Sequence, residues 1–191
     1  SSNSSVVRKH LEKDDKVFHA EIVGSPFFIL KNDSASTAIS ITETAQATVC
    51  FSRAWREGLY GLNSYWVNPD QIKTAAPSGQ FIAKGSFIVD GQRNFVKVTN
   101  MRLCVGLFEK DGSCSLMCGP PDPVKKNCTY YVIIEPSGYE MTEIAKKIKF
   151  EFLKFKEKEG MVKAISIDDF IRVLPAGESH IVESGTGEAY K

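Results

Sequence analysis

Short stretches of alternating hydrophobic and polar residues open the chain and predict a small β-sheet. In the segment KVFHAEIV, residues 16–23, alternate positions share a face, so Val17, His19 and Glu21 lie together on one side of a strand. The turn sequence Gly-Ser-Pro separates this strand from a second one over residues 27–32, which is apolar enough to be buried.

A helix and further strands follow in the same half of the sequence. The helix is predicted over residues 40–57, because Ser40 and Glu43 have the spacing of a capping box. Small residues on several of its faces indicate close packing on a sheet. One strand is predicted over residues 60–67, and the Asp-Gly pair at 90–91 predicts a type I′ turn within a hairpin over residues 86–98.

The second half of the sequence has a different texture. Its predicted elements, in order, are a strand and turn over 101–112, a Pro/Gly-rich connection over 115–128, a buried strand over 129–136, an amphipathic helix over 141–158, a short helix over 167–174 and a frayed end over 183–191. Six lysines make the outer surface of the long helix basic, which is typical of a solvated helix face.

Together these patterns predict an α+β fold. We expect a mixed or antiparallel β-sheet packed with a central helix, plus a smaller C-terminal α/β extension. Residues 1–98 are assigned to the first domain and residues 99–191 to the extension, which can pack on the first as one unit. A chain of 191 residues, 42% of them hydrophobic, is long enough for such an arrangement.

Composition and charge narrow the class of protein. The net charge of +1 means that any attraction to nucleic acid has to come from a local basic patch. No apolar run approaches the roughly 18 residues of a membrane span, so we expect no membrane association. Five cysteines without a secretory signal indicate reduced thiols and a cytoplasmic protein. Because Cys114 and Cys118 lack a second close pair, neither a metal site nor a cofactor is predicted.

Catalytic signatures are scarce. The phosphate-loop, dinucleotide-binding, nucleophile-elbow and zinc-protease motifs are all missing from the sequence. His19 and Glu21 on one strand face can form a proton-transfer pair or half of a metal site, which leaves a metal-dependent hydrolase or nuclease as an alternative. Asp70 follows a proline and is typical of a turn or a cap. We therefore expect a protein that is not an enzyme and has no small-molecule substrate.

A surface-recognition pattern remains. The basic residues Lys73, Lys84, Arg93 and Lys97 are interleaved with the aromatic residues Tyr65, Trp66, Phe81, Phe87 and Phe95. Cationic groups pair with phosphates and rings stack on unpaired bases, so the pattern favours RNA. The same pattern also describes a half-buried hairpin with its rings inward and its lysines outward. Composition leaves both interpretations open.

Four stretches, taken in order, resemble one family. They are DKVFHAEIVGSPFFILKN, TAQATVCFSRAW, YWVNPDQIKTAAPSGQFIAKGSF and GQRNF, all within residues 5–98. In combination they resemble the NFACT-R domain, the RNA-binding domain of the NFACT family. The later stretch KAISIDDFIRVLPAG is similar to the C-terminal tail of archaeal members. Glu21 departs from the family pattern, which has Asp there. The family domain also begins further upstream, which implies that the chain is a fragment.

The resemblance implies RNA binding in ribosome-associated quality control. Full-length relatives engage stalled large ribosomal subunits that carry peptidyl-tRNA, so the implied partners are the large ribosomal subunit and tRNA. By position, the candidate RNA-binding residues are His19, Lys73, Lys84, Arg93, Trp66 and Gln71. The first four are expected to contact phosphates and the last two to shape the loop.

Two neighbouring predictions accompany this assignment. Arg53 and Trp55 are expected to brace the helix against the RNA-binding loop. The label "fibronectin-binding-like", which is attached to some family members, leaves a protein-interaction module as a further alternative. The resemblance supplies no catalytic residue.

Overall fold

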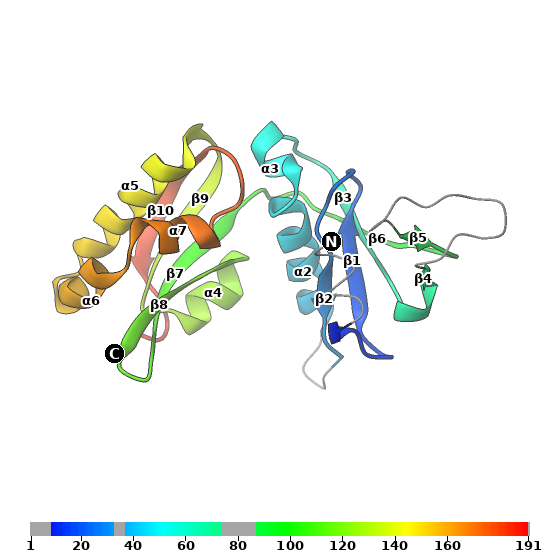
Figure 1. Cartoon of the computed structure of the whole chain (residues 1–191), viewed down its shortest axis with the longest axis horizontal. Helices are drawn as coiled ribbons and strands as arrows, with labels where there is room; N and C mark the ends of the chain where they lie inside the picture. The colour runs from blue at the N-terminus through cyan, green and yellow to red at the C-terminus, as the bar shows by residue number, and fades with distance from the viewer. Residues whose placement is uncertain (1–8, 33–36, 74–86, 191) are drawn as a thin grey trace. The chain divides into compact units, whose positions relative to one another are not determined.

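The chain folds into two compact units, each with its own antiparallel sheet. The computed structural model describes residues 9–32, 37–73 and 87–190. One unit contains the chain up to Ser52 together with Gly61–Thr99, and the other contains Arg53–Tyr60 together with Asn100–Lys191. Each unit holds a four-stranded antiparallel sheet (Figure 1). The α+β class is confirmed. The division into a first domain over residues 1–98 and an extension over residues 99–191 stays a prediction.

The first unit is built around a sheet with the strand order β2-β1-β3-β6. Its elements are β1 (Lys16–Ala20), β2 (Phe28–Leu30), α2 (Ala38–Cys50), β3 (Asn63–Val67), the 3-10 turn η1 (Pro69–Gln71), β4 (Ile72–Lys73), β5 (Ile88–Val89) and β6 (Asn94–Lys97). In Figure 1, α2 runs along one side of this sheet, and the small β4-β5 ribbon lies on the side away from α2.

Alternation along the strands gives this sheet two different faces. Phe18, Ala20 and Ser64 are buried on the face that α2 covers. Residues that lie opposite each other in antiparallel strands share a face. His19 is opposite Tyr65, and Tyr65 is opposite Phe95, so these three residues form a row on the face away from α2.

The helix predicted over residues 40–57 is two separate helices. The Thr37 side chain accepts a hydrogen bond from the backbone N–H of Ser40, while the Ser40 hydroxyl accepts one from the N–H of Thr37. This reciprocal pair makes Thr37 the N-cap in place of the predicted Ser40, so α2 starts at Ala38. α2 ends at Cys50, and α3 (Arg53–Glu57) belongs to the second unit.

The hairpin predicted around residues 90–91 is not formed. β5 pairs with β4 and β6 pairs with β3, so the flanking strands belong to different sheets. Gly91 has a positive φ but Asp90 does not, whereas a type I′ turn needs both. The same dipeptide at Asp111 and Gly112 has φ values of 51° and 75° and joins β7 (Leu103–Lys110) to β8 (Ser113–Gly119).

The second unit has the strand order β10-β9-β7-β8. Its remaining elements are α4 (Pro121–Asn127), β9 (Tyr130–Tyr139), α5 (Met141–Leu153), the 3-10 turn η2 (Lys156–Lys158), α6 (Glu159–Ala164), α7 (Ile167–Val173) and β10 (Ser179–Thr186). None of the described helices is long and apolar enough to cross a membrane.

Three predictions for this half are corrected. The expected connection over 115–128 forms most of β8 and all of α4, because a proline at the first helical position is already set to the helical φ. The long helix ends at Leu153 instead of residue 158. Residues 183–186, in the end predicted to fray, form the last part of β10. The Gly187 N–H, directly after the strand, donates to the Thr129 carbonyl at 2.8 Å.

Both faces of the second sheet are covered. Cys104 and Ile133 pack with Val124 and Cys128 on the face that α4 covers. Leu103, Val105 and Leu107 alternate with them and are fully buried on the other face, where α5 and α7 lie. Gly106 permits the close approach of α4, because a Cβ at this position would lie 2.7 Å from both the Cβ of Cys128 and the Cγ1 of Val124.

α3 is anchored within the second unit. The indole N–H of Trp55 donates to the Glu178 carbonyl at 3.1 Å and to the Ser179 hydroxyl at 3.0 Å. Gly177 lets this segment approach, since it has a φ of 125° and a Cβ there would lie 2.6 Å from the Cα of Arg56. The prediction that Trp55 braces the RNA-binding loop is therefore wrong. Its partners come from the start of β10.

Candidate nucleic-acid interface

An exposed stripe of two cations and one ring lies on β6, the edge strand of the first sheet. Arg93, Phe95 and Lys97 are exposed, whereas Asn94 and Val96 between them are half-buried. The Phe95 side chain is 56% exposed, which is unusual for a ring on a sheet. Alternate residues of a strand share a face and lie about 6.8 Å apart. The strand therefore presents a cation, an aromatic ring and a second cation on one face.

An aromatic row crosses the sheet beneath this stripe. The Tyr65 ring centroid lies 5.8 Å from that of Phe95 and 5.8 Å from that of His19. The His19 ring is in turn 5.3 Å from the ring of Phe27. The guanidinium carbon of Arg93 lies 4.8 Å from the centre of the Tyr65 ring. Tyr65 is only 7% exposed, so it forms the floor of the site and Phe95 forms its accessible surface.

His19 lies in this row with an altered proton affinity. Burial lowers the pKa of His19, the backbone groups of Ala20 and Ser25 raise it in part, and the charge of Arg93 lowers it again. The net direction is downward, so the imidazole is neutral at pH 7. Its Nδ1 atom is buried and has no hydrogen-bond partner among the described residues. A neutral ring offers hydrogen bonding and stacking, but no charge to offset a phosphate.

Gln71 holds the turn that precedes the β6 stripe. Its Oε1 accepts the N–H of Asn68 at 2.9 Å, and its Nε2 donates to the carbonyls of Asp90 at 2.9 Å and Gln92 at 2.8 Å. These bonds use three of the four hydrogen-bonding positions of the amide. They fix the segment directly before Arg93, which agrees with the predicted loop-shaping role of Gln71.

Lys73, Arg93 and Lys97 are the basic residues of the predicted RNA-recognition pattern that the structure describes. Lys73, on β4, is exposed and its ammonium donates to the Asp70 carbonyl at 2.7 Å. Across the described ranges 9–32, 37–73 and 87–190, neither Lys73, Arg93 nor Lys97 forms an ion pair. Their charges are therefore available to an external anion. Lys84, the remaining predicted phosphate contact, lies outside the described residues.

Trp66 is separated from the other candidate residues. It follows Tyr65 on β3, so its side chain points to the opposite face of the sheet. There it lies opposite Phe18, with the Lys16 ammonium 5.3 Å from its ring centre. The geometry brings His19 and Arg93 together at Tyr65, and it does not bring Trp66 to them.

Two residues of the site were not selected from the sequence. Phe95 and Lys97 belonged to the basic and aromatic pattern but not to the candidate list. The informative signal was the alternation in RNFVKV, which places Arg93, Phe95 and Lys97 on one face of a strand. The predicted hairpin concealed it, because a hairpin would direct the rings inward.

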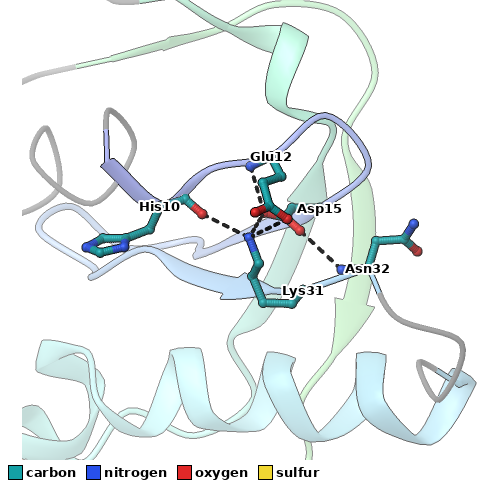
Figure 2. A network of polar contacts seen from close by, with 5 residues as sticks. All are labelled: His10, Glu12, Asp15, Lys31 and Asn32. Atoms are coloured by element: carbon teal, nitrogen blue, oxygen red, sulfur yellow. Dashed lines mark hydrogen bonds and ion pairs between the residues drawn. The ribbon is translucent and has the colours of Figure 1, made fainter.

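An ionic network around the buried Asp15 lies at the other end of this face. Figure 2 shows the Lys31 ammonium directed at the His10 carbonyl and at the carboxylates of Glu12 and Asp15, at 3.0, 3.1 and 2.7 Å. Asp15 also accepts the N–H groups of Glu12 at 2.8 Å and Asn32 at 3.1 Å. Burial alone would raise the pKa of Asp15, but these hydrogen bonds and the Lys31 charge outweigh it and lower the pKa.

The network holds one covering segment in place. Leu11 lies between two of its members and packs, with Ile72 and Val89, on the cluster formed by Val17, Tyr65 and Val67. This end of the face is thus apolar and covered. The β6 end remains exposed. One acid, Glu21, also lies on the face, where its carboxylate accepts a hydrogen bond from the Asn63 amide at 2.7 Å.

The fold and surface define a class of small sheet modules, with a helix on one face and a cationic and aromatic stripe on the other. Residues 1–91 match the family described as "NFACT protein RNA binding domain". The chain belongs to the NFACT family, and these residues are its NFACT-R domain.

Several relatives share more of the chain. The archaeal Rqc2 homolog aRqcH of Methanocaldococcus jannaschii is 33% identical over 183 residues, which cover 95% of this chain and 26% of that protein. An alignment of this length includes most of the second unit. The ribosome quality control complex subunit NEMF homolog of Drosophila melanogaster is 30% identical over 110 residues, 56% of this chain. Human NEMF is 28% identical over 115 residues, 59% of this chain.

The chain spans 26% of the length of the archaeal relative and 11% of each of these NEMF proteins. Among solved structures, the C-terminal part of the fibronectin/fibrinogen-binding protein from Streptococcus suis has a TM-score of 0.42 at 18% identity, covering 51% of this chain and 36% of that one. A likeness of that size supports no argument about fold or function.

Proposed function

We propose that the β6 face of the first unit binds RNA in a ribosome quality control factor, on the large ribosomal subunit and its tRNA. One observation carries this proposal. Arg93, Phe95 and Lys97 form an exposed stripe of cation, ring and cation, and in the described structure neither cation has an acidic partner. Such a stripe matches an RNA strand, whose phosphates need cations and whose unpaired bases stack on rings.

The roles follow from the positions of the side chains. Arg93, Lys97 and Lys73 contact phosphates, and Phe95 stacks on a base. His19 and Tyr65 support the stripe from below, and Gln71 fixes the turn that leads into it. Lys84 remains a predicted phosphate contact outside the described residues. The ribosomal setting is supported by the relatives, which are named as an Rqc2 homolog and as ribosome quality control complex subunits.

The competing enzyme hypothesis has less support. A hydrolase that used His19 and Glu21 would need their side chains to converge on one ion or substrate. The His19 ring instead packs between Phe27 and Tyr65, and the Glu21 carboxylate is bonded to Asn63. Within the described ranges, no group of three His, Cys, Asp or Glu side chains is arranged to hold a metal ion. We therefore propose no second function.

The test is RNA binding by the whole chain as a function of salt. Each lost phosphate contact on a single strand lowers the slope of log K against log salt by about 0.7, so Arg93→Gln with Lys97→Gln should lower it by about 1.4. Phe95→Leu keeps an apolar side chain but removes the ring, and it should cost about 1–3 kcal/mol of binding free energy.

A matched control separates this site from general charge. The exposed residues Lys13 and Lys126, changed together to glutamine, remove the same two charges elsewhere on the chain. Fluorescence anisotropy with labelled tRNA and ribosomal RNA fragments measures both pairs. Equal losses for the two double variants would mean that RNA responds only to total charge, and the site assignment would then be wrong.

A further inference from the structure

The lysines of α5 and of the turn after it differ in what they contact. The Lys149 ammonium donates to the carbonyls of Lys163 and Ile165 at the end of α6. Three others each have a carboxylate within 4 Å, in the pairs Lys154–Glu151, Lys156–Glu159 and Lys158–Glu109. Lys146 and Lys147, by contrast, form no ion pair with any described residue. The charges of Lys146 and Lys147 are therefore not offset by a described carboxylate.

These two lysines line a groove together with exposed rings. The groove runs between α5 and the β9-β10 end of the sheet, and it is lined by Tyr139, Lys146, Lys147, Phe150, His180 and Ile181. Phe150 is 63% exposed and Tyr139 is 40% exposed. The Lys147 ammonium lies 4.1 Å from the centre of the Tyr139 ring, and the Lys154 ammonium lies 5.4 Å from that of Phe150.

Two acids also line the groove without reversing its charge. Glu151 is paired with Lys154 at 2.6 Å, so that pair is neutral overall. The remaining charges that line the groove are the carboxylate of Glu143 and the ammonium groups of Lys146 and Lys147, so the groove has a net positive charge. On the β10 side of the groove, the Nδ1 of His180 lies 3.0 Å from the Ser137 carbonyl.

We propose that this groove of the second unit binds single-stranded RNA, with bases stacked on Phe150 and Tyr139 and phosphates held by Lys146 and Lys147. An acidic peptide could satisfy the lysines, but its carboxylates would make no stacking contact with the exposed rings of Phe150 and Tyr139. Bases use ring faces, and stacking does not depend on their sequence. This site lies beyond residues 1–91, where the RNA-binding family matches, and it rests on the second unit's own residues.

The experiment isolates the groove in the full chain. The starting protein carries Arg93→Gln, Phe95→Leu and Lys97→Gln, which remove the surface proposed for the first unit. A fluorescein-labelled 12-nucleotide oligouridylate measures the remaining affinity by anisotropy. Adding Phe150→Leu should weaken this binding by about five-fold or more, because it removes a stacking partner and keeps the apolar bulk. Phe150→Trp should preserve it.

Charge is tested separately and with a matched control. Lys146→Gln with Lys147→Gln should lower the salt slope of the remaining binding by about 1.4, the value for two phosphate contacts on a single strand. Lys126→Gln with Lys163→Gln removes two exposed lysines of α4 and α6 and should leave the slope unchanged. Equal slopes for the two double variants would overturn the groove assignment.

Amide NMR spectra of the same proteins locate the contact directly. Oligouridylate should shift the amides of Tyr139, Lys146, Lys147 and Phe150. If no shift occurs there, or if Phe150→Leu and Phe150→Trp bind equally well, the proposal is wrong. A 12-residue oligoglutamate that shifts these amides when RNA does not would identify an acidic peptide as the occupant and also overturn it. None of these results bears on the first unit, whose stripe is absent from the starting protein.

Discussion

The two sheets of this chain have the same number of strands but different coverings. In the second unit, α4 packs on one face, and α5 and α7 pack on the other. In the first unit, α2 covers one face, while among the described residues Leu11, Phe27, Ile72 and Val89 cover part of the other. A sheet covered on both sides serves as a scaffold. A sheet left partly open can present its strands' side chains to a partner, and that open part is where the cation and ring stripe lies.

The difference is visible in the burial of single strands. The first five residues of β7, Leu103 to Leu107, are all buried, so both of its faces meet other elements. β6 alternates between half-buried and exposed residues, as expected for a strand with one solvated face. The continuous apolar strand thus marks the sheet that is covered on both faces, and the alternating strand marks the sheet with an exposed face.

The largest expected effect comes from the same substitution made in both units. Phe152 on α5 is fully buried and its ring lies 6.0 Å from that of Phe170 on α7, so Phe152→Ala should lower the free energy of unfolding by about 3–5 kcal/mol. Phe95→Ala on the open face should change stability by less than about 0.5 kcal/mol, as exposed positions do. Urea denaturation measures both values.

Native-state hydrogen exchange assigns each loss to its unit. Phe152→Ala should speed the exchange of β9 amides, and Phe95→Ala should leave the amides of β3 protected while it weakens RNA binding. If Phe95→Ala destabilised the first unit as much as Phe152→Ala destabilises the second, the Phe95 face would be a covered face and not an open one.

A smaller effect is expected from the network that closes the apolar end of the first sheet. Asp15 is 1% exposed and accepts hydrogen bonds from the Lys31 ammonium and from two backbone N–H groups. Asp15→Asn removes the charge and should cost about 1.5–3 kcal/mol, the usual contribution of hydrogen bonds to a charged group. The nearby exposed Asp14→Asn is the control and should cost little.

The pH dependence of this effect has a defined sign. The pKa of Asp15 is lower in the folded chain than its ordinary value of 3.8, so the ionised form stabilises the fold. That stability is fully present above the unfolded pKa and is lost as the pH falls through the folded pKa. The difference between wild type and Asp15→Asn should therefore be constant from pH 7 to about 5 and should shrink below 3.8. A constant difference down to pH 2.5 would contradict the assigned role of Asp15.

The strands and the main helices were predictable because their signals are local. Alternation located β1 and β3, and the apolar stripe located α5. The errors arose where two equivalent signals competed. The Asp-Gly pairs at 90–91 and 111–112 are identical in sequence. The strands around the first pair belong to different sheets, because β6 pairs with β3. The strands around the second pair, β7 and β8, pair with each other, so only this pair forms the tight turn. The end of α2 at Cys50 was missed for a similar reason, because α2 belongs to the first unit and α3 belongs to the second.

The site was predictable in part for a related reason. Arg93 and Lys73 were selected as candidates from their charge, and Gln71 from its loop. Trp66 was grouped with them although neighbouring residues of a strand point to opposite faces, and Phe95 was left out although alternate residues share one. Strand register, which the sequence does not state, decides both cases. Charge is readable from composition, but the face that carries it is readable only once the strand partners are known.

The smallest expected effect concerns Glu21, an acid on the open face. Glu21 shares the face of Asn63 and Lys97, because Glu21 N–H bonds to the Asn63 carbonyl and Asn63 lies opposite Lys97. Glu21 lies about 10 Å from β6, the width of two strand spacings. At that distance two unit charges in water interact by about 0.4 kcal/mol. Glu21→Gln should therefore tighten RNA binding about two-fold at low salt. Because charges at this distance are screened, the gain should vanish near 0.5 M salt.

Glu43→Gln, on the helix that covers the other face, removes the same charge and should produce a smaller gain. An equal gain from both variants in the anisotropy assay would mean that RNA does not distinguish the two faces of the first sheet.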